Sequence, residues 1–149
     1  MRIIVQRCDR AHVEVNNRIV GKINKGMMIL VGFTHNDTEK EIDYLVNKVL
    51  NLRIYDDENG IMNKSILDVG GSILSISQFT LYGDATKGNR PSYINALNGE
   101  KSIVLYKMFN EKLNEKIHVE TGIFGAEMKV DFVNDGPITI LLERENKDA

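Results

Sequence analysis

The sequence has few of the features that mark secreted or membrane proteins. Cys8 is the one cysteine among 149 residues, so no disulfide can form within the chain. No apolar run approaches the roughly 18 residues of a membrane-spanning helix. The segment Met1–Arg7 is too short, and becomes charged too soon, for a signal peptide. These absences predict a cytoplasmic protein that binds no membrane.

Patterns typical of metal and cofactor sites are also missing. The histidines His12, His35 and His118 are far apart, and no spacing of His, Cys, Asp or Glu resembles a zinc site. No glycine-rich segment matches a dinucleotide-binding or phosphate-binding loop. Cys8 closes an apolar segment, which favours a small core residue over a nucleophile. We therefore expect no metal and no cofactor. Any catalysis would come from hydroxyl groups, backbone amides, water or the substrate.

The charge of the chain limits how it can bind nucleic acid. Its 19 Lys and Arg residues face 21 Asp and Glu, which gives a formal net charge of −2. Proteins that hold nucleic acid mainly through phosphates are usually basic. We expect no DNA binding, and an RNA substrate would be held weakly or through a local patch. Lys87 and Arg90 are candidates for that patch, although solvated surface cations are the commoner case.

Apolar periodicity predicts one domain spanning residues 1–149. Hydrophobic residues make up 42% of the chain, which allows one sizeable core. Two helices are predicted, one from a capping box at Thr38 and Glu41 to Leu52, and one over Glu100–Leu113. Strands are predicted over Arg2–Arg7, His12–Val15, Arg18–Gly21, Gly26–Phe33, Ser72–Leu81, Ile117–Thr121, Met128–Phe132 and Ile138–Leu142, with an irregular piece at Met62–Val69. This order predicts an α/β fold of layered, mostly antiparallel, barrel-like sheets with two covering helices.

One predicted strand becomes polar at its end. Ser77, Gln78 and Thr80 place an amide and two hydroxyls there beside the aromatic residues Phe79 and Tyr82. A buried strand has little use for so many polar side chains unless something hydrogen-bonds to them. Two interpretations stay open. The segment is a binding or catalytic element, or it is a strand end whose hydroxyls satisfy the local backbone.

A second candidate feature is the sharp turn predicted at Asn134–Pro137, between the last two strands. About 5–6% of X–Pro bonds in folded proteins are cis, and both isomers stay open at Pro137. Gly136 carries no Cβ, which relaxes the usual restriction on the residue before proline. A rigid turn of this kind would present a fixed backbone carbonyl, which suits discrimination between ligands by shape.

Both features resemble the signature motifs of the D-aminoacyl-tRNA deacylases. The two motifs read Ser-Gln-Phe-Thr-Leu at Ser77–Leu81 and Asn-Asp-Gly-Pro-Ile-Thr at Asn134–Thr139. Further blocks similar to this family follow in the same order along nearly the whole chain: Met1–Arg7, Val31–Thr38, Lys48–Ile54, Leu67–Gly71, Lys87–Ser92, Glu120–Gly122 and Phe124–Met128. Ile138 stands where valine is usual, and Cys8 is also unusual for the family.

The resemblance implies a homodimeric enzyme that hydrolyses the ester between a D-amino acid and tRNA. It also implies that glycine mischarged on tRNA(Ala) is accepted. The family's functional residues correspond here to a catalytic set and a set for substrate binding or chiral selection: Ser77, Gln78, Phe79 and Thr80, then Gly136, Pro137, Met128 and Arg7. The Gly136–Pro137 bond would be cis and would enter the partner's active site, with Arg7 fixing the turn.

Simple sterics make the implied function coherent. A Gly136 carbonyl beside the substrate Cα would exclude an L side chain, whereas a D side chain would point to solvent and glycine has nothing to exclude. Backbone N–H groups near Phe79 and Thr80 would stabilise the oxyanion, and Phe79 would pack on the adenine. Thr80 is a candidate nucleophile, but no adjacent base is visible. The alternative, which we favour, is that the ribose 2′-hydroxyl activates water.

Two other functions fit the same residues. One is a non-catalytic dimeric module that binds RNA or another ligand on the same scaffold. The other is a hydrolase of a different ester that uses Thr80 as its nucleophile. Turnover at substoichiometric protein separates the first from an enzyme, and a trapped acyl-enzyme identifies the second.

Overall fold

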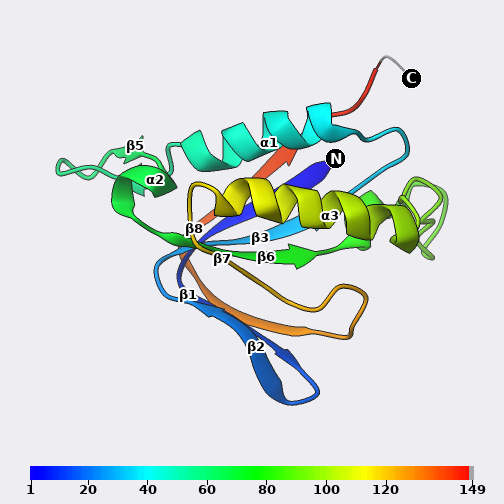
Figure 1. Ribbon diagram of the computed structural model, residues 1–149, viewed down its shortest axis with the longest axis horizontal. Helices are drawn as coiled ribbons and strands as arrows, with labels where there is room; N and C mark the ends of the chain where they lie inside the picture. The colour runs from blue at the N-terminus through cyan, green and yellow to red at the C-terminus, as the bar shows by residue number, and fades with distance from the viewer. Residues whose placement is uncertain (148–149) are drawn as a thin grey trace.

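The chain folds as a strongly curved sheet with two long helices across one face. The computed structural model describes residues 1–147, and Figure 1 shows α1 (Glu39–Asn51) and α3 (Gly99–Asn114) on the same side of the sheet. Lys112 on α3 joins the two helices through ion pairs with Glu39 and Asp43, at 2.8 and 2.6 Å. The α/β class and the two covering helices are as the sequence predicted.

Six strands form the main sheet. They are β1 (Arg2–Val15), β2 (Arg18–Ile23), β3 (Gly26–Gly32), β6 (Ser72–Ser77), β7 (Val119–Thr121) and β8 (Lys129–Glu143). The order is β2-β1-β3-β6-β7, and β8 pairs with β1 on the edge away from β3. β1 is antiparallel to β2, β3 and β8, whereas β6 is parallel to both β3 and β7. The two parallel connections pass through α1 and α3, because parallel strands need a long crossover.

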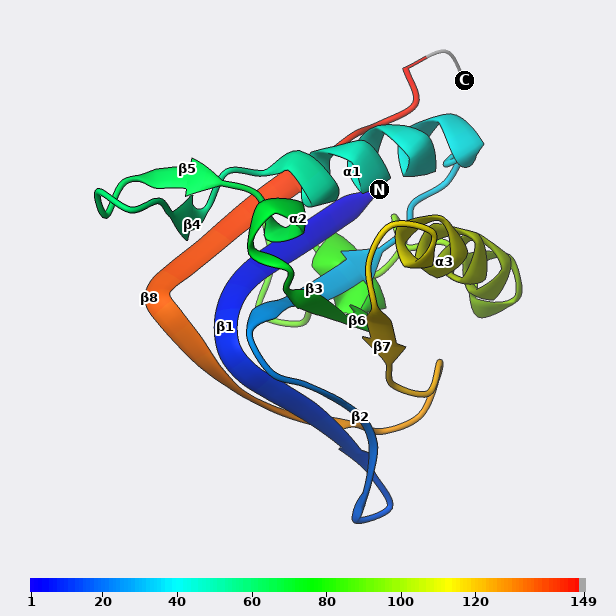
Figure 2. The ribbon, with the colours of Figure 1, turned by 60° about the vertical axis from the view of Figure 1, so that its left-hand side comes forward.

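β1 and β8 are long, bent strands that curl the sheet on itself (Figure 2). The part of β1 up to Cys8 pairs with β3, and the part from Ala11 onward pairs with β2. The bend brings β2 close to β7, since a Cβ placed on Gly21 would lie 2.5 Å from the Thr121 carbonyl oxygen. The sheet is therefore nearly closed, as the predicted barrel-like form requires.

Two apolar cores lie on the two sides of this sheet. β3 contributes to both, because Ile29 and Val31 face the helices while Met28 faces the inside of the curl. The prediction that this strand is buried on both faces is confirmed. The smaller core, inside the curl, consists of Cys8, Ala11, Val13, Ile23, Met28, Leu74 and Ile76.

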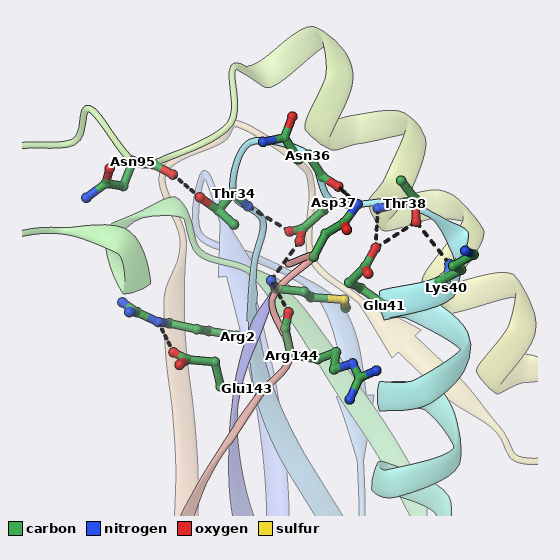
Figure 3. Close-up of polar contacts among 12 residues, drawn as sticks. Arg2, Thr34, Asn36, Asp37, Thr38, Lys40, Glu41, Asn95, Glu143 and Arg144 are labelled. Carbon is green, nitrogen blue, oxygen red and sulfur yellow. Dashed lines mark hydrogen bonds and ion pairs between the residues drawn. The ribbon is translucent and has the colours of Figure 1, made fainter. Parts of the chain in front are cut away.

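A polar network fixes the entry to α1 (Figure 3). The Thr38 N–H donates to the Glu41 carboxylate at 2.7 Å, which forms the predicted capping box. Just before it, the Asp37 carboxylate accepts the Thr34 N–H at 2.8 Å. Asp37 also pairs with the α-ammonium of Met1 at 2.9 Å, and both side chains are fully buried. The network ties Met1, the residue before β1, to the segment between β3 and α1.

The sharp turn predicted at Asn134–Pro137 is wrong, because these residues lie inside β8. Gln6 pairs with Thr139 and Cys8 with Asn134, so Arg7 alone faces the four residues 135–138. Extra residues on one strand of an antiparallel pair make a bulge, which bends the strand without ending it. Gly136 and Pro137 do not end the strand, because β1 pairs with β8 on both sides of them.

The other differences are local. β6 ends at Ser77 instead of Leu81, and Phe79–Tyr82 forms a 3-10 turn, η1. The predicted strands Arg2–Arg7 and His12–Val15 are one continuous strand, β1. The irregular piece at Met62–Val69 contains β5 (Met62–Lys64), which pairs with β4 (Tyr55–Asp56), and the short α2 (Ile66–Val69). A second capping box, Ser65 with Asp68, starts α2 and was readable in the sequence.

No helix within residues 1–147 has the length and apolar character needed to cross a membrane.

Candidate active site

A pocket of about 570 Å³ lies beside the polar segment that follows β6. The parallel strands β3 and β6 both end at this edge of the sheet, and their chains turn away toward α1 and α3. A crevice at the carboxyl ends of strands is the usual ligand site in such sheets. The walls include Ser77, Gln78, Phe79, Tyr93, Phe124 and Met128. Apolar and aromatic walls with a few polar groups are typical of small-ligand sites.

The backbone of the polar segment is held at the end of the sheet. The Gln78 N–H donates to the Val31 carbonyl at 2.7 Å, and the chain then enters η1. This turn closes with a bond from the Gly83 N–H to the Thr80 carbonyl at 2.9 Å. The first N–H groups of a helical turn have no partner inside it. The amides of Phe79 and Thr80 are therefore available to an anionic group.

Phe79 and Tyr93 form an aromatic rim on the pocket. Their ring centroids are 5.1 Å apart with an interplanar angle of 71°, an edge-to-face contact. The Phe79 side chain is 55% exposed, so much of its ring is open to a ligand. The loop of Tyr93 is fixed to the segment after β3, because the Thr34 hydroxyl donates to the Asn95 carbonyl at 2.5 Å. This rim is therefore ordered by the same network that starts α1.

Thr80 lies at the edge of the site and is exposed; it is absent from the pocket walls. Within residues 1–147, its hydroxyl makes no hydrogen bond to a histidine or carboxylate. A threonine nucleophile needs an adjacent base, so the geometry offers Thr80 no activation. In the same described part, no cluster of three or more His, Cys, Asp and Glu could hold a metal ion.

A second cavity, of about 640 Å³, borders the C-terminal end of η1. Its walls carry charges of both signs, from Arg2, Asp84 and Glu145 together with His35. The Arg2 guanidinium stacks on the Tyr82 ring at 4.4 Å, so this cation supports η1. The cavity contains none of the residues predicted for the site, and we assign the site to the smaller pocket.

The second signature motif lies toward the other end of β3. Gly136 and Pro137 are exposed, and the peptide bond between them is cis. Arg7, beside them, pairs with Met27 near the start of β3, whereas the pocket borders Val31 near its end. Four residues of strand span about 13 Å. The chain thus brings together Ser77, Gln78, Phe79 and Met128, with Thr80 at their edge, but not Arg7, Gly136 and Pro137.

Arg7 is a mostly buried cation that holds the bulge of β8. Its Nε donates to the Asp135 carbonyl at 3.0 Å, and its Nη1 donates to the Ile54 carbonyl at 2.7 Å. On the other side of the bulge, Asn134 Oδ1 accepts the Ile138 N–H at 2.8 Å. The Gly136–Pro137 segment is therefore held at both ends and projects as a defined surface feature.

Sequence reasoning missed two walls of the pocket. Tyr93 comes from the loop before α3 and Phe124 from the loop after β7. An aromatic residue in a polar loop was the one available signal for Tyr93. Phe124 begins one of the blocks similar to the family, but its place in the pocket wall depends on how β7 is positioned beside β6.

Comparison with known proteins identifies the family of the chain. Residues 4–143 match the family model described as D-Tyr-tRNA(Tyr) deacylase. The chain belongs to this deacylase family. Its relatives include the D-aminoacyl-tRNA deacylases of Thermosipho melanesiensis, 55% identical, and Brevibacillus brevis, 54% identical. Both alignments cover 96% of this chain, and they cover 97% and 99% of those relatives. The family suggested by the two motifs and the expected enzyme class, a deacylase, are confirmed.

Solved structures share the fold of this deacylase. One is the c-Myc DNA Unwinding Element Binding Protein, with a TM-score of 0.93 and 39% identity, covering 98% of this chain and 100% of that one. Another is described as a probable eukaryotic D-amino acid tRNA deacylase, with a TM-score of 0.81 and 20% identity, covering 95% and 97%. At that identity, the second likeness supports the fold alone.

The contacts of Arg7 predict a stability change for Arg7→Lys. Lysine cannot donate to the Asp135 and Ile54 carbonyls in the same fork geometry. We expect the free energy of unfolding in urea to fall by about 2 kcal/mol, as for lost hydrogen bonds to a charged group. Arg10→Lys is the matched control, because Arg10 and its partner Asp131 are both 61% exposed. It should change stability by less than about 0.5 kcal/mol. Equal effects would contradict the holding role of Arg7.

Proposed function

We propose that the protein hydrolyses the ester bond of D-aminoacyl-tRNA and releases the free D-amino acid and tRNA. The observation that carries this proposal is the Ser77–Thr80 segment beside an aromatic pocket, in a chain that belongs to the deacylase family. The pocket suits an aminoacyl-adenosine end, because Phe79 and Tyr93 offer ring surfaces to a base. The cytoplasmic location expected from the sequence stays a prediction.

The proposed active unit is a homodimer in which each site combines two protomers. Gly136 and Pro137 are exposed, held by the Arg7 bulge, and distant from the pocket of their own chain. Within the described residues, β8 pairs with β1 alone, so its outer edge is free. Leu141 on β8 is also 57% exposed. A second copy packed on this region would cover apolar surface and bring Gly136 to the partner's Ser77–Thr80.

Chiral selection in this proposal works by exclusion. The Gly136 carbonyl of the partner lies beside the substrate Cα and blocks the direction of an L side chain. A D side chain points to solvent, so many D-amino acids are accepted. Glycine has no side chain to exclude, so glycine mischarged on tRNA(Ala) is hydrolysed as well. Met128, in the pocket wall, contributes to substrate contact.

The proposed chemistry depends mainly on backbone amides and on the substrate. Water attacks the ester carbonyl carbon, and the N–H groups of Phe79 and Thr80 stabilise the oxyanion, at about 2.7–4 kcal/mol per donor. The ester bond then breaks, and its ribose oxygen leaves with a proton. The neighbouring ribose 2′-hydroxyl orients the water and relays the proton: it accepts the proton that the water loses and passes its own hydroxyl proton to the leaving ribose oxygen. Ser77 and Gln78 position the ester.

The alternative is a non-catalytic dimeric module that binds RNA on the same scaffold. Its distinguishing property is protection of the ester. With protein far below the substrate concentration, an enzyme releases many equivalents of D-tyrosine, whereas a binder releases none beyond the spontaneous rate.

Gly136→Ala is expected to change selection between enantiomers. Gly136 has φ +131°, and an added Cβ would lie 2.7 Å from Ile138 Cγ1, so the segment must move. Rates of hydrolysis of D-tyrosyl-tRNA and L-tyrosyl-tRNA should show the D-to-L preference reduced about tenfold or more. Gly60→Ala is the control, because Gly60 has φ +74° but open space around it. Unchanged rates on both substrates would contradict the exclusion mechanism.

Complementation tests whether the site is shared. A Gln78→Ala homodimer is expected to lose hydrolysis, and a Gly136→Ala homodimer is expected to lose its preference for the D substrate. When the two are unfolded and refolded together, each mixed dimer has one site with both intact elements and one site with neither. Purified mixed dimers should therefore hydrolyse D-tyrosyl-tRNA at about half the wild-type rate, with the wild-type preference over L-tyrosyl-tRNA. If Gly136 acted on its own chain, the one site with intact Gln78 would carry the Gly136→Ala change, and the preference would stay reduced.

Thr80→Ala separates the two mechanisms. Loss of a true nucleophile costs a factor of about 10³ or more, whereas the substrate-assisted mechanism predicts a loss within about tenfold. The paired substrate is D-tyrosyl-tRNA with a 2′-deoxy terminal adenosine. It should be hydrolysed very slowly by the wild type. Full activity on that substrate would contradict the role of the 2′-hydroxyl.

A further inference from the structure

β6 extends beyond its neighbour β7 at the border of the pocket. The ladder between them ends at the pair Ser75–Thr121, whereas β6 continues to Ser77. The bond from the Ile73 N–H to the His118 carbonyl, at 3.0 Å, shows that the odd-numbered residues of β6 direct their backbone groups toward β7. The Ser75 carbonyl and the Ser77 N–H therefore face the side on which the partner strand has ended. Buried backbone groups of this kind need another partner.

The Tyr106 side chain on α3 supplies that partner. Its hydroxyl donates to the Ser75 carbonyl at 2.7 Å, and the Ser77 backbone N–H is a neighbouring polar group that lowers its pKa. One hydroxyl has a donor and two acceptor positions, so it can serve both groups at once. Tyr106 is 5% exposed, so water does not compete freely for these bonds. The Tyr106 hydroxyl thus takes the place of a β7 backbone group at the point where β7 stops.

Burial keeps the Tyr106 hydroxyl protonated, and the Tyr106 ring contacts a residue of the pocket wall. Burial raises the pKa of Tyr106, and this outweighs the lowering effect of the neighbouring polar groups of Ser75, Asn110 and Ser77, so the hydroxyl is a donor at neutral pH. The Tyr106 ring also contacts the ring of Phe124, with centroids 5.8 Å apart. Phe124 is in the pocket wall. The same residue therefore contacts both the end of β6 and the loop after β7.

We infer that Tyr106 is a positioning residue for the active site, whose hydroxyl replaces the missing strand neighbour and sets the place of Ser77. The inference rests on the proposed function, in which the Ser77–Thr80 segment positions the ester. Tyr106 does not line the pocket, so it acts through Ser77 without contacting the substrate. A tyrosine that merely filled the core would act through its ring alone.

Tyr55 offers a matched comparison. It is also buried, at 1% exposure, and its hydroxyl donates to the Gly26 carbonyl at 2.6 Å. Gly26 begins β3, at the end of the strand away from the pocket. Tyr55→Phe and Tyr106→Phe therefore remove the same kind of buried bond, and only the second one touches the segment beside the site.

The first measurement is kinetic, on D-tyrosyl-tRNA. We expect Tyr106→Phe to lower kcat about tenfold or more, as for small displacements in a site, with KM within about threefold. Tyr55→Phe should keep kcat within about twofold, even where the two variants lose similar thermal stability. Circular dichroism checks that both are folded. Equal kcat values for the two variants would overturn the inference.

The second measurement does not depend on activity. Amide hydrogen exchange, followed by NMR, should show the Ser77 N–H strongly protected in the wild type, although β7 has ended there. Tyr106→Phe should speed its exchange about tenfold or more, and Tyr55→Phe should not. Fast exchange in the wild type would overturn the inference without any variant. If the wild type failed to hydrolyse D-tyrosyl-tRNA, the proposed function would fall, while Ser77 exchange would still decide whether Tyr106 holds β6.

Discussion

The bulge in β8, held by the buried Arg7 guanidinium, is the constraint on which the rest of the arrangement depends. Arg7 faces four residues of β8, which bends β8, and a second irregularity between Cys8 and Ala11 bends β1 beside it. The bend turns the second half of β1 and the whole of β2 toward β7, which nearly closes the sheet. Without it, β1 and β8 would continue as a flatter sheet, and the smaller core inside the curl would have no opposing wall.

Because of the same bend, the two signature motifs lie apart within one protomer, near opposite ends of β3. Residues of β8 before the bulge, such as Val130, reach the pocket together with Met128, whereas Gly136 and Pro137 stay at the bend. A monomer therefore has the polar segment and its pocket but not the second motif beside them. In the proposed dimer, the second protomer would supply the Gly136–Pro137 segment, which the first protomer does not bring to its own pocket.

Strand lengths decide the shape of the pocket. β7 stops at Thr121, two residues short of the register at which β6 ends, and the loop that follows opens the space beside Ser77. An open strand edge next to a binding site would normally be loose. The Tyr106 hydroxyl occupies that edge, so the Ser75 carbonyl of β6 keeps a hydrogen bond although the neighbouring strand is ending there.

Local chemistry was readable from the sequence: the Thr38 and Glu41 capping box, the doubly buried β3, and the polar segment from Ser77 to Thr80 each follow from neighbouring residues alone. Family motifs added the enzyme class. Tertiary structure decided where β6 ends, that Asn134–Pro137 lies within a strand, and that Tyr93, Phe124 and Tyr106 surround the site. The physical reason is that a turn signal specifies a backbone bend but not its pairing. Strand ends and pocket walls depend on partners distant in the chain, such as β1 for Asn134–Pro137 and α3 for Ser75.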